Sequence, residues 1–333
     1  MANEHMWNDL GGGLLGNHQI SDDLLWASTG MTQLVKHTKP YTGFQKNAGD
    51  TVNMYHVLPI PDLQNAELEE EGEVPVRMLA FGHRALTLTE HGTAIKFTHK
   101  LELLFKFGIP AVMQEALSKH LAETQDNEVA ALGFLNSDIK LVATPSSLSG
   151  LTFSTTGTPG AIASYPMTKD HVKKISAYMW DTIHVPFINR GKRKDIGSQD
   201  NSDHYVCLSA GSNIESLLND PDVASWQKSM GAGAMIYRNE QCNLHNIRFV
   251  RINRQNAFGD EIGTSEVIGD ACFFGDYGVA EVMAEKPTLR INPNWGGKAG
   301  LVKAYLWYGV YTYGPYFNYA DDGLAKAIRW GSL

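Results

Sequence analysis

The sequence is poor in cysteine and in basic residues, and it has no long apolar run. Its three cysteines, Cys207, Cys242 and Cys272, form no C-x-x-C pair that would start a zinc or redox site, so we expect buried thiols in a reducing cytoplasm. Lysine and arginine number 28 against 36 aspartate and glutamate, a formal charge of -8, which argues against broad binding to a phosphate backbone. Every apolar run is shorter than the roughly 18 to 20 residues of a membrane span, and the N-terminus does not resemble a signal peptide. We therefore expect a soluble protein that is not secreted.

Motifs for nucleotides and metals are also missing. GGGLLG at 11–16 has the glycine spacing of a dinucleotide-binding loop, but no strand precedes it. NWGGKAG at 294–300 lacks both the first glycine and the hydroxyl residue of a P-loop. His83, His91 and His99 are eight residues apart, so on an extended strand neighbours in this series would lie about 26 Å apart, too far for one metal ion. We expect these histidines to be solvated or locally hydrogen-bonded, and we expect no cofactor and no metal.

Alternating apolar and polar residues predict strands at 51–60, 84–89 and 93–99, and therefore a long hairpin over about 50–99. Ten residues of strand extend about 30 Å, and an isolated two-stranded ribbon is only marginally stable, so the hairpin needs a partner surface. Its far end carries five glutamates: Glu67, Glu69, Glu70, Glu71 and Glu73. Two interpretations remain open for this acidic run, which are solubility and a contact with another subunit.

Two helices are predicted in the middle of the chain. The first spans about 110–136, starts near Pro110, and places Val112, Met113, Ala116, Leu117 and Leu121 on one apolar face. The second begins after Thr168 as the N-cap, with Val172, Ile175 and Met179 on a shared face. The residues between them, 137–166, are rich in serine, threonine, glycine and proline, which predicts an irregular connector or insertion.

The C-terminal half predicts a strand, a helix and a strand over 205–253, followed by further strands. In the segment 301–314 both alternating faces are apolar, as expected of a strand buried on both sides. A basic run precedes this region: Arg190, Lys192, Arg193 and Lys194. It is interpreted either as a solvated loop or as an ionic contact to a neighbouring acidic surface, for which the glutamate run is a candidate.

The order of these parts resembles the major capsid (coat) protein family of tailed bacteriophages, with the Hong Kong ninety-seven type capsid fold that encapsulin shells share. GDTVNMYHVLPIPDLQNAELEEEGEVPVRM, followed by RALTLTEHGTAIKF, resembles the family's extended loop, and FGIPAVMQEALSKHLAETQDNEVAAL resembles its spine helix. YVCLSAGSNIESLLNDPDVASWQKSMGAGAM with NLHNIRFVRIN resembles a strand, helix and strand of its axial domain. The sequence is similar to the group typified by the coat proteins of large podophages. No single motif is diagnostic, so the resemblance depends on several segments in the right order.

The resemblance implies an α+β phage capsid fold with five parts. These are an N-terminal arm at 1–47, an extended loop at 48–99, a peripheral domain at 100–185 that holds the spine helix, an axial domain at 186–300, and a C-terminal strand within 301–333 that returns to the core sheet. It also implies that the extended loop lies over the spine helix of a neighbouring subunit, which would make the acidic run a docking element.

The implied function is a structural one, with no enzyme activity. Subunits of this family form hexamers and pentamers of an icosahedral head, which is assembled in the bacterial cytoplasm and encloses double-stranded DNA. The chain lacks the long helical N-terminal extension that acts as a fused scaffold in some relatives, so the resemblance implies a separate scaffolding protein, a portal and, in some relatives, decoration proteins. An acidic inner wall would repel the packaged DNA and let it pack without sticking, with no sequence-specific binding. We expect no membrane partner.

Two alternatives remain. An encapsulin-like nanocompartment would have the same fold but would enclose enzyme cargo. A soluble hydrolase using Ser202 or Ser212 is the alternative from another class, although no G-x-S-x-G elbow exposes a serine in this sequence. Closed shells would favour the capsid or the nanocompartment, whereas activity as a monomer would favour the hydrolase.

Overall fold

The computed structural model describes eleven stretches of the 333 residues, and every structural statement below concerns these. The stretches are 32–43, 49–58, 78–100, 109–143, 151–154, 167–188, 203–224, 239–252, 271–292, 301–317 and 325–332. The chain divides into two compact units that interleave along the sequence. The first comprises Met1–Asp50, Thr87–Gly133 and Ala280–Gly314, and the second comprises Thr51–Leu86, Phe134–Val279 and Pro315–Leu333.

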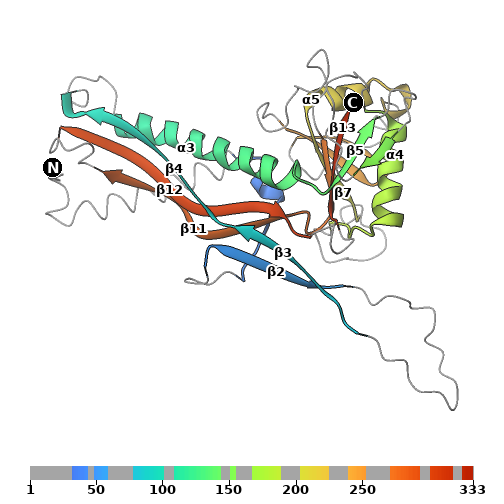
Figure 1. The fold of residues 1–333 in the computed structure, drawn as a ribbon. Coiled ribbons are helices and arrows are strands. Elements are labelled where there is room, and N and C mark those ends of the chain that lie inside the picture. Colours follow the sequence, from blue (N-terminus) through green and yellow to red (C-terminus); the bar gives the residue numbers. More distant parts are fainter. Residues whose placement is uncertain are drawn as a thin grey trace, which may run out of the picture. The chain divides into compact units, whose positions relative to one another are not determined.

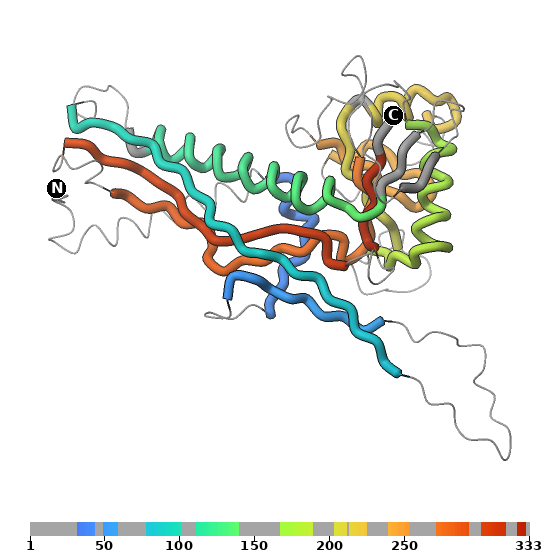
Figure 2. Tube along the Cα trace, viewed as in Figure 1, coloured from blue at the N-terminus to red at the C-terminus, as the bar shows by residue number. Residues whose placement is uncertain are grey.

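The first unit consists of a long helix beside a sheet of long strands (Figures 1 and 2). Its four-stranded sheet has the order β1 (Lys39–Pro40), β11 (Val279–Asn292), β12 (Val302–Pro315) and β4 (Thr89–Thr98). β12 and β4 are antiparallel, with Val302 opposite Thr98 and Tyr311 opposite Thr89, whereas the short β1 runs parallel to β11. The helix α3 (Ile109–Glu128) lies along β4 and continues as a π-helix over Val129–Phe134, which confirms the long helix predicted at 110–136.

The buried face of α3 differs in part from the predicted one. Leu117 and Leu121 are fully buried as expected, but Val112 and Ala116 are exposed. The buried stripe instead includes polar side chains, among them Ser118 and Asp126. A pattern of apolar residues alone misplaces this stripe because polar groups with hydrogen-bond partners occupy core positions.

Strand β12 also departs from its prediction. Its odd-numbered face, which includes Tyr305, Trp307, Tyr311 and Tyr313, is buried as expected. The opposite face is only half-buried in the middle of the strand and becomes buried near the C-terminal end. Apolar residues on both faces therefore do not correspond to burial on both sides along the whole strand.

The second unit contains a seven-stranded sheet and two helices. The strand order is β6 (Leu151–Ser154), β5 (Ile139–Ala143), β13 (Ala327–Ser332), β10 (Ala271–Phe274), β7 (Tyr205–Ser209), β9 (Ile247–Arg251) and β8 (Glu240–Leu244). β7 and β9 are parallel neighbours, and α5 (Gly211–Leu218) lies between them in the sequence, which confirms the predicted strand, helix and strand.

The helix α4 (Lys169–Ala177) confirms the predicted N-cap, because Thr168 Oγ1 accepts a hydrogen bond from the backbone N–H of His171 at 3.3 Å. It continues as a π-helix over Tyr178–Thr182. The three predicted face residues, Val172, Ile175 and Met179, are fully buried. Local sequence signals were sufficient to predict this helix because the N-cap residue and the spacing of the apolar residues indicate the same helix.

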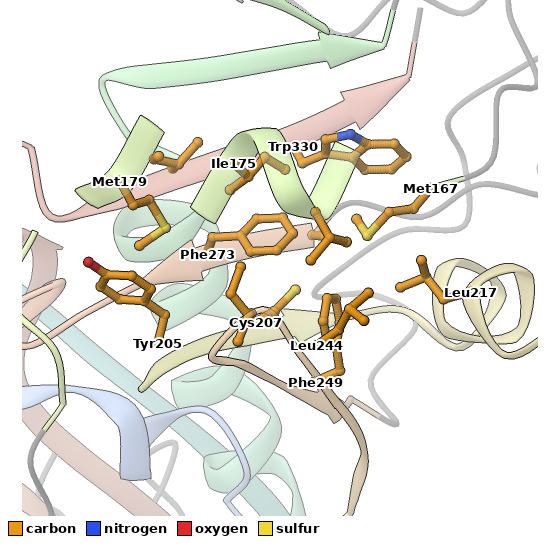
Figure 3. Packing of buried hydrophobic residues seen from close by; sticks show 14 of the residues in the cluster. Met167, Ile175, Met179, Tyr205, Cys207, Leu217, Leu244, Phe249, Phe273 and Trp330 are labelled. Carbon is orange, nitrogen blue, oxygen red and sulfur yellow. The ribbon is translucent and has the colours of Figure 1, made fainter. Parts of the chain in front are cut away.

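The core of the second unit lies between α4 and the sheet (Figure 3). Ile175 and Met179 from the helix face Phe273 on β10, and Cys207 on β7 lies on the other side of Phe273. Trp330 on β13 completes the buried aromatic set, and Phe249 packs edge-to-face on Phe273 at 6.0 Å between ring centroids. All three cysteines are buried thiols that form no disulfide, as predicted.

Two predictions of secondary structure are wrong. The segment 137–166 was predicted to be irregular, but it contains the antiparallel strands β5 and β6, and β5 also pairs in parallel with β13. The predicted hairpin was too long: β2 (Thr51–Val57) pairs with β3 (Phe81–Thr87) in a two-stranded sheet, but β4 leaves this ribbon and pairs with β12. In both cases a distant segment supplies the partner strand, which local composition cannot show. Among the described helices, none is long and apolar enough to span a bilayer.

Candidate assembly surfaces

All nine predicted contact residues lie outside the described part of the chain. They are Glu67, Glu69, Glu70, Glu71, Glu73, Arg190, Lys192, Arg193 and Lys194. Their contact to a neighbouring subunit remains a prediction. Ser202, a serine of the hydrolase alternative, also lies outside the described part of the chain, whereas Ser212 falls in the first turn of α5.

The β2–β3 ribbon has two different faces. Val52 and Met54 on β2 and Leu86 on β3 are buried. On the opposite face the side chains of Tyr55 and Phe81 are 73% and 65% exposed, and Val57 is exposed beside them. Because strand residues alternate between faces, these three side chains share the outer face of one ribbon. We call Tyr55, Val57 and Phe81 the outer ribbon face.

The ribbon is held together by pairing between its two strands, and a ring contact joins it to the rest of the second unit. The backbone N–H of Leu58 donates to the carbonyl of Ala80 at 2.9 Å, which extends the pairing beyond β2. The ring of His56 packs edge-to-face on Phe317 with centroids 4.8 Å apart, and Lys326 lies 5.6 Å from the centroid of Phe317. On the outer ribbon face the ring of Tyr55 lies 6.1 Å from that of His83, and Tyr55 itself remains largely exposed.

Exposed aromatic side chains on a narrow ribbon are suited to contact with another surface. A buried Phe or Tyr removes about 150–250 Å² from water, and aromatic residues are enriched at the centres of protein interfaces. A two-stranded ribbon gains the stability that it lacks by itself when one face is covered. The outer ribbon face is therefore our first candidate assembly surface.

The outward side of α3 is the second candidate. Val112, Ala116 and Leu132 are exposed along the helix and its π-helical continuation. Between them in the sequence, Lys119 and Glu115 form an exposed ion pair at 2.6 Å, and the hydrogen bond from Lys119, followed by its positive charge, lowers the pKa of the Glu115 carboxyl. This side therefore offers small apolar patches with charges of both signs, which fits a protein partner better than a nucleic acid.

An open cavity of about 420 Å³ lies beside α4 in the second unit. Its wall includes Trp180 stacked on Phe187 at 4.9 Å and Phe187 against Tyr205 at 4.5 Å. Ser176 also lines the cavity, but its hydroxyl donates to the backbone carbonyl of His245 at 2.9 Å rather than to an imidazole. The described wall therefore contains no serine activated by a histidine base. The sequence analysis did not predict this cavity. The feature that could have indicated it is Trp180, a large aromatic residue directly after the buried Met179 on the helix.

Cysteine chemistry is disfavoured in the described core. Burial raises the pKa of Cys242 to about 12 and also raises that of Cys207 well above its ordinary value, and the thiolate is the reactive form. Among the described residues there is also no group of three or more His, Cys, Asp or Glu that could hold a metal ion.

Solved structures with a similar fold are capsid proteins of bacteriophages. The capsid of Ralstonia phage GP4 is 12% identical, with a TM-score of 0.58, and the match covers 88% of this chain and 86% of that one. The cyanophage Pam1 capsid is 11% identical with a TM-score of 0.61 and covers 88% of both chains. The head structure of Helicobacter pylori bacteriophage KHP40 is 10% identical with a TM-score of 0.61, covering 87% of this chain and 85% of that one.

No protein-family model matches the sequence, and no curated protein matches it. The structural matches nevertheless cover nearly the whole of both chains, so the α+β phage capsid fold predicted from the sequence is confirmed. At 10 to 12% identity they show the fold alone.

Proposed function

We propose that this chain is the major capsid protein of a tailed bacteriophage, which self-assembles into the hexamers and pentamers of an icosahedral head. The observation that carries this proposal is the match to the phage capsids of GP4 and Pam1 over 88% of the chain, which includes both compact units. The exposed outer ribbon face is a second, independent reason, because it leaves two large aromatic side chains in water unless another surface covers them.

In this proposal the ribbon of one copy lies over α3 of a neighbouring copy. The apolar patches on α3 would receive Tyr55 and Phe81, and its exposed charges would set the register. The acidic run from Glu67 to Glu73 and the basic run from Arg190 to Lys194 would add an ionic contact between subunits. The parts would be an arm at 1–47, an extended loop at 48–99, a peripheral domain at 100–185, an axial domain at 186–300 and a C-terminal segment at 301–333.

The remaining partners follow from the same proposal. Assembly in the host cytoplasm would use a separate scaffolding protein and a portal, with decoration proteins as a further possible class of partner. Packaged double-stranded DNA would meet a wall of net negative charge, since the chain carries a formal charge of -8, and would not be bound at a specific sequence. The chain would act as a structural protein and not as an enzyme.

Electron microscopy of the purified protein, with light scattering to give its mass, tests this proposal first. We expect closed shells, or rings of six and five subunits. A monomer at every concentration, even with scaffolding proteins added, would overturn the proposal. Uniform small shells that enclose an enzyme would support the nanocompartment alternative instead.

Substitutions on the ribbon test how the subunits associate. Tyr55→Ser combined with Phe81→Ser should leave the fold of the isolated chain intact because both side chains are exposed. Each aromatic ring that is buried at an interface contributes about 1.5–3 kcal/mol, so each substitution should weaken association about tenfold or more. Leu301→Ser, at an exposed apolar residue that is not part of the ribbon, is the matched control. Equal shell yields for the double variant and the control would contradict the assignment of this surface.

A further inference from the structure

The open cavity beside α4 is built from three parts of the second unit. Lys173 lies on α4 and Trp180 on its π-helical continuation. Phe187 follows this helix, and His245 belongs to the turn between β8 and β9. The volume of about 420 Å³ falls in the range of roughly 300–1,000 Å³ that is usual for binding pockets. The cavity is therefore large enough for one side chain of a partner with its adjoining backbone.

Hydrogen bonds hold the wall of this cavity in place. Ser176 on α4 donates from its hydroxyl to the carbonyl of His245 at 2.9 Å, and the backbone N–H of Tyr205 donates to the carbonyl of Asn246, also at 2.9 Å. His245 and Asn246 have positive φ angles of 49° and 62°, as in a tight two-residue hairpin turn. The Tyr205 hydroxyl donates to the carbonyl of Val185 at 2.9 Å. A wall that is already ordered binds a partner without the entropic cost of ordering it.

The cavity combines an aromatic wall with a positive charge. The ring of Phe187 lies between those of Trp180 and Tyr205, and Trp180 is 55% exposed. Lys173 also lines the cavity and is exposed. Burial and then the charge of Lys173 lower the pKa of His245, partly opposed by Asp170, so this charge acts across to the β8–β9 turn. The cavity is thus suited to an apolar side chain that has a carboxylate nearby.

The acidic run of the sequence contains this combination of groups. Leu68 lies between Glu67 and Glu69, and Glu70 follows. In an extended peptide, residues two apart are on the same side and about 7 Å from each other. A bound extended segment would therefore present Leu68 and Glu70 together on one side and Glu69 on the other.

The position of Leu68 in the chain is suited to contact with another copy. The backbone N–H of Leu58 donates to the carbonyl of Ala80, which holds the two ends of the intervening segment together at the end of the ribbon. Leu68 comes ten residues after Leu58 and ten residues before Met78. Ten residues span at most about 35 Å, so Leu68 has the longest reach from the ribbon within this segment.

Charge complementarity extends beyond Lys173. Arg190, the first residue of the basic run, follows Phe187 by three residues, so the two Cα atoms are at most about 11 Å apart. An acidic segment bound at the cavity would meet these cations as well. A single-stranded nucleic acid is the other polymer that combines stacking groups with negative charge, but the formal charge of -8 on the chain repels it.

We propose that Leu68 of one copy inserts into the cavity beside α4 of another copy, with Glu70 paired to Lys173. This inference rests on the proposed assembly function and assigns to its acidic run a defined binding pocket. The leucine contributes affinity by covering Trp180 and Phe187, and the charges determine the register in which the segment binds.

Binding of a fluorescently labelled peptide with the sequence of residues 63–76 to the full-length chain tests the pocket directly. The chain carries Leu68→Asn, so that its own acidic run competes less. We expect Leu68→Asn in the peptide, or Trp180→Ser in the chain, to weaken binding about tenfold or more, because a buried leucine is lost or uncovered. Trp180 is exposed, so its substitution leaves the core intact, and Leu301→Ser, outside the cavity, is the control.

Exchange of charges tests the proposed pair. Lys173→Glu in the chain should weaken binding about fivefold, and Glu70→Lys in the peptide should restore most of this loss. Glu69→Lys gives a peptide of the same net charge and should not restore it. Lys174→Glu, at the next residue, which does not line the cavity, should change binding by less than about twofold. Equal recovery with the two peptide variants would mean unspecific attraction and would overturn the proposal.

New cysteines identify the copy that supplies Leu68. Chains with Leu68→Cys are assembled together with chains with Ala177→Cys, an exposed residue that lines the cavity, and are then oxidised. Each chain carries one of the two new thiols and the native cysteines are buried, so a disulfide between the two variants joins two copies. We expect this dimer on a non-reducing gel, and little of it from either variant alone or with Glu215→Cys, exposed on α5, in place of Ala177→Cys. A chain with both substitutions that forms the disulfide only within itself would overturn the proposal.

The results separate this inference from the proposed function. Shells or rings without peptide binding, or without the mixed disulfide, would overturn the docking of Leu68 and leave the capsid proposal standing. A monomer at every concentration would overturn the capsid proposal, and peptide binding to that monomer would still support the pocket. Displacement of the peptide by a short oligodeoxythymidine that binds more tightly would assign the cavity to nucleic acid instead and overturn the docking.

Discussion

The buried ion pair between Arg248 and Glu240 gives the sharpest prediction for the stability of the second unit. Arg248 on β9 and Glu240 on β8 lie 2.8 Å apart, with side chains only 3% and 1% exposed. Removing two charges from water costs several kcal/mol per ion, and their pairing offsets this cost. Glu240→Leu leaves the guanidinium buried without its carboxylate, and we expect it to destabilise the unit by about 3–5 kcal/mol.

The expected change in melting temperature follows from the size of the unit, which has about 200 residues. For domains of this size 1 kcal/mol shifts the Tm by about 2–4 °C, so Glu240→Leu should lower it by about 6–20 °C. The double variant Glu240→Leu with Arg248→Leu should recover most of this loss because no charge remains buried. Differential scanning calorimetry on the four proteins of this cycle measures the coupling energy directly.

An exposed pair in the same unit serves as the control. Arg251 and Glu215 lie 3.4 Å apart with side chains 50% and 64% exposed, and such pairs contribute about 0–1 kcal/mol. Glu215→Leu should therefore shift the Tm by no more than about 4 °C. If Glu240→Leu shifts the Tm as little as Glu215→Leu, or if the double variant is no more stable than Glu240→Leu, the reasoning about the buried pair is refuted.

Two further predictions concern buried ionisable groups. Asp126 accepts hydrogen bonds from the backbone N–H groups of Gln33 and Leu34, both at 3.0 Å. Asp126→Asn should therefore lower the free energy of unfolding by about 1–3 kcal/mol and speed proteolysis near Leu34. The control Asp222→Asn, at an exposed carboxylate, should have neither effect. Burial and, secondarily, Lys174 lower the pKa of His171 to about 4, so the stability that depends on its neutral form is present above pH 6.5 and falls by up to roughly 3 kcal/mol as pH drops towards 4. His171→Leu should remove this loss of stability at acid pH without lowering stability near pH 7, because neither ring nitrogen of His171 has a hydrogen-bond partner. Urea unfolding of the wild type and the variant at pH 7 and 4.5 measures the difference. An equal loss of stability at pH 4.5 in the wild type and in His171→Leu would contradict this role of His171.

Much of the second unit could be predicted from local sequence. Thr168 caps α4, and the buried residues Val172, Ile175 and Met179 follow at helical spacing. The strand, helix and strand over β7, α5 and β9 were found in the same way because each element has its own apolar pattern. In these places the signal for an element lies within the element itself.

Pairing between distant segments could not be predicted. β5 lies in a region of loop-forming composition, but it pairs with β13, and Ile139 lies opposite Ile328 in that pair. Likewise β4 has the alternation of a hairpin strand, yet its partner is β12, more than two hundred residues later. Alternation shows that a segment is a strand, whereas the choice of partner depends on the whole fold.

For the candidate surfaces too, local sequence predicts the element, whereas burial and distant contacts are seen only in the structure. Alternation predicted a strand over 51–60, but only the structure shows that Tyr55 and Val57 lie on the exposed face of β2. His91 was expected to be solvated or locally hydrogen-bonded, and its contact with Thr89 is indeed local. Its contact with Glu128 is not local, because it depends on α3 lying along β4, and no pattern in either segment indicates it.

The polar residues of α3 explain why its apolar face was misplaced, and they also affect how this helix can work. Asp126 holds the backbone at Gln33 and Leu34, and Glu128 holds His91, so the C-terminal end of the helix is attached by charge-assisted contacts as well as by Leu117 and Leu121. Apolar packing is lost gradually as surfaces separate, whereas a charge-assisted contact depends on protonation and on direction. An attachment of this kind can be released and remade without unfolding the apolar core.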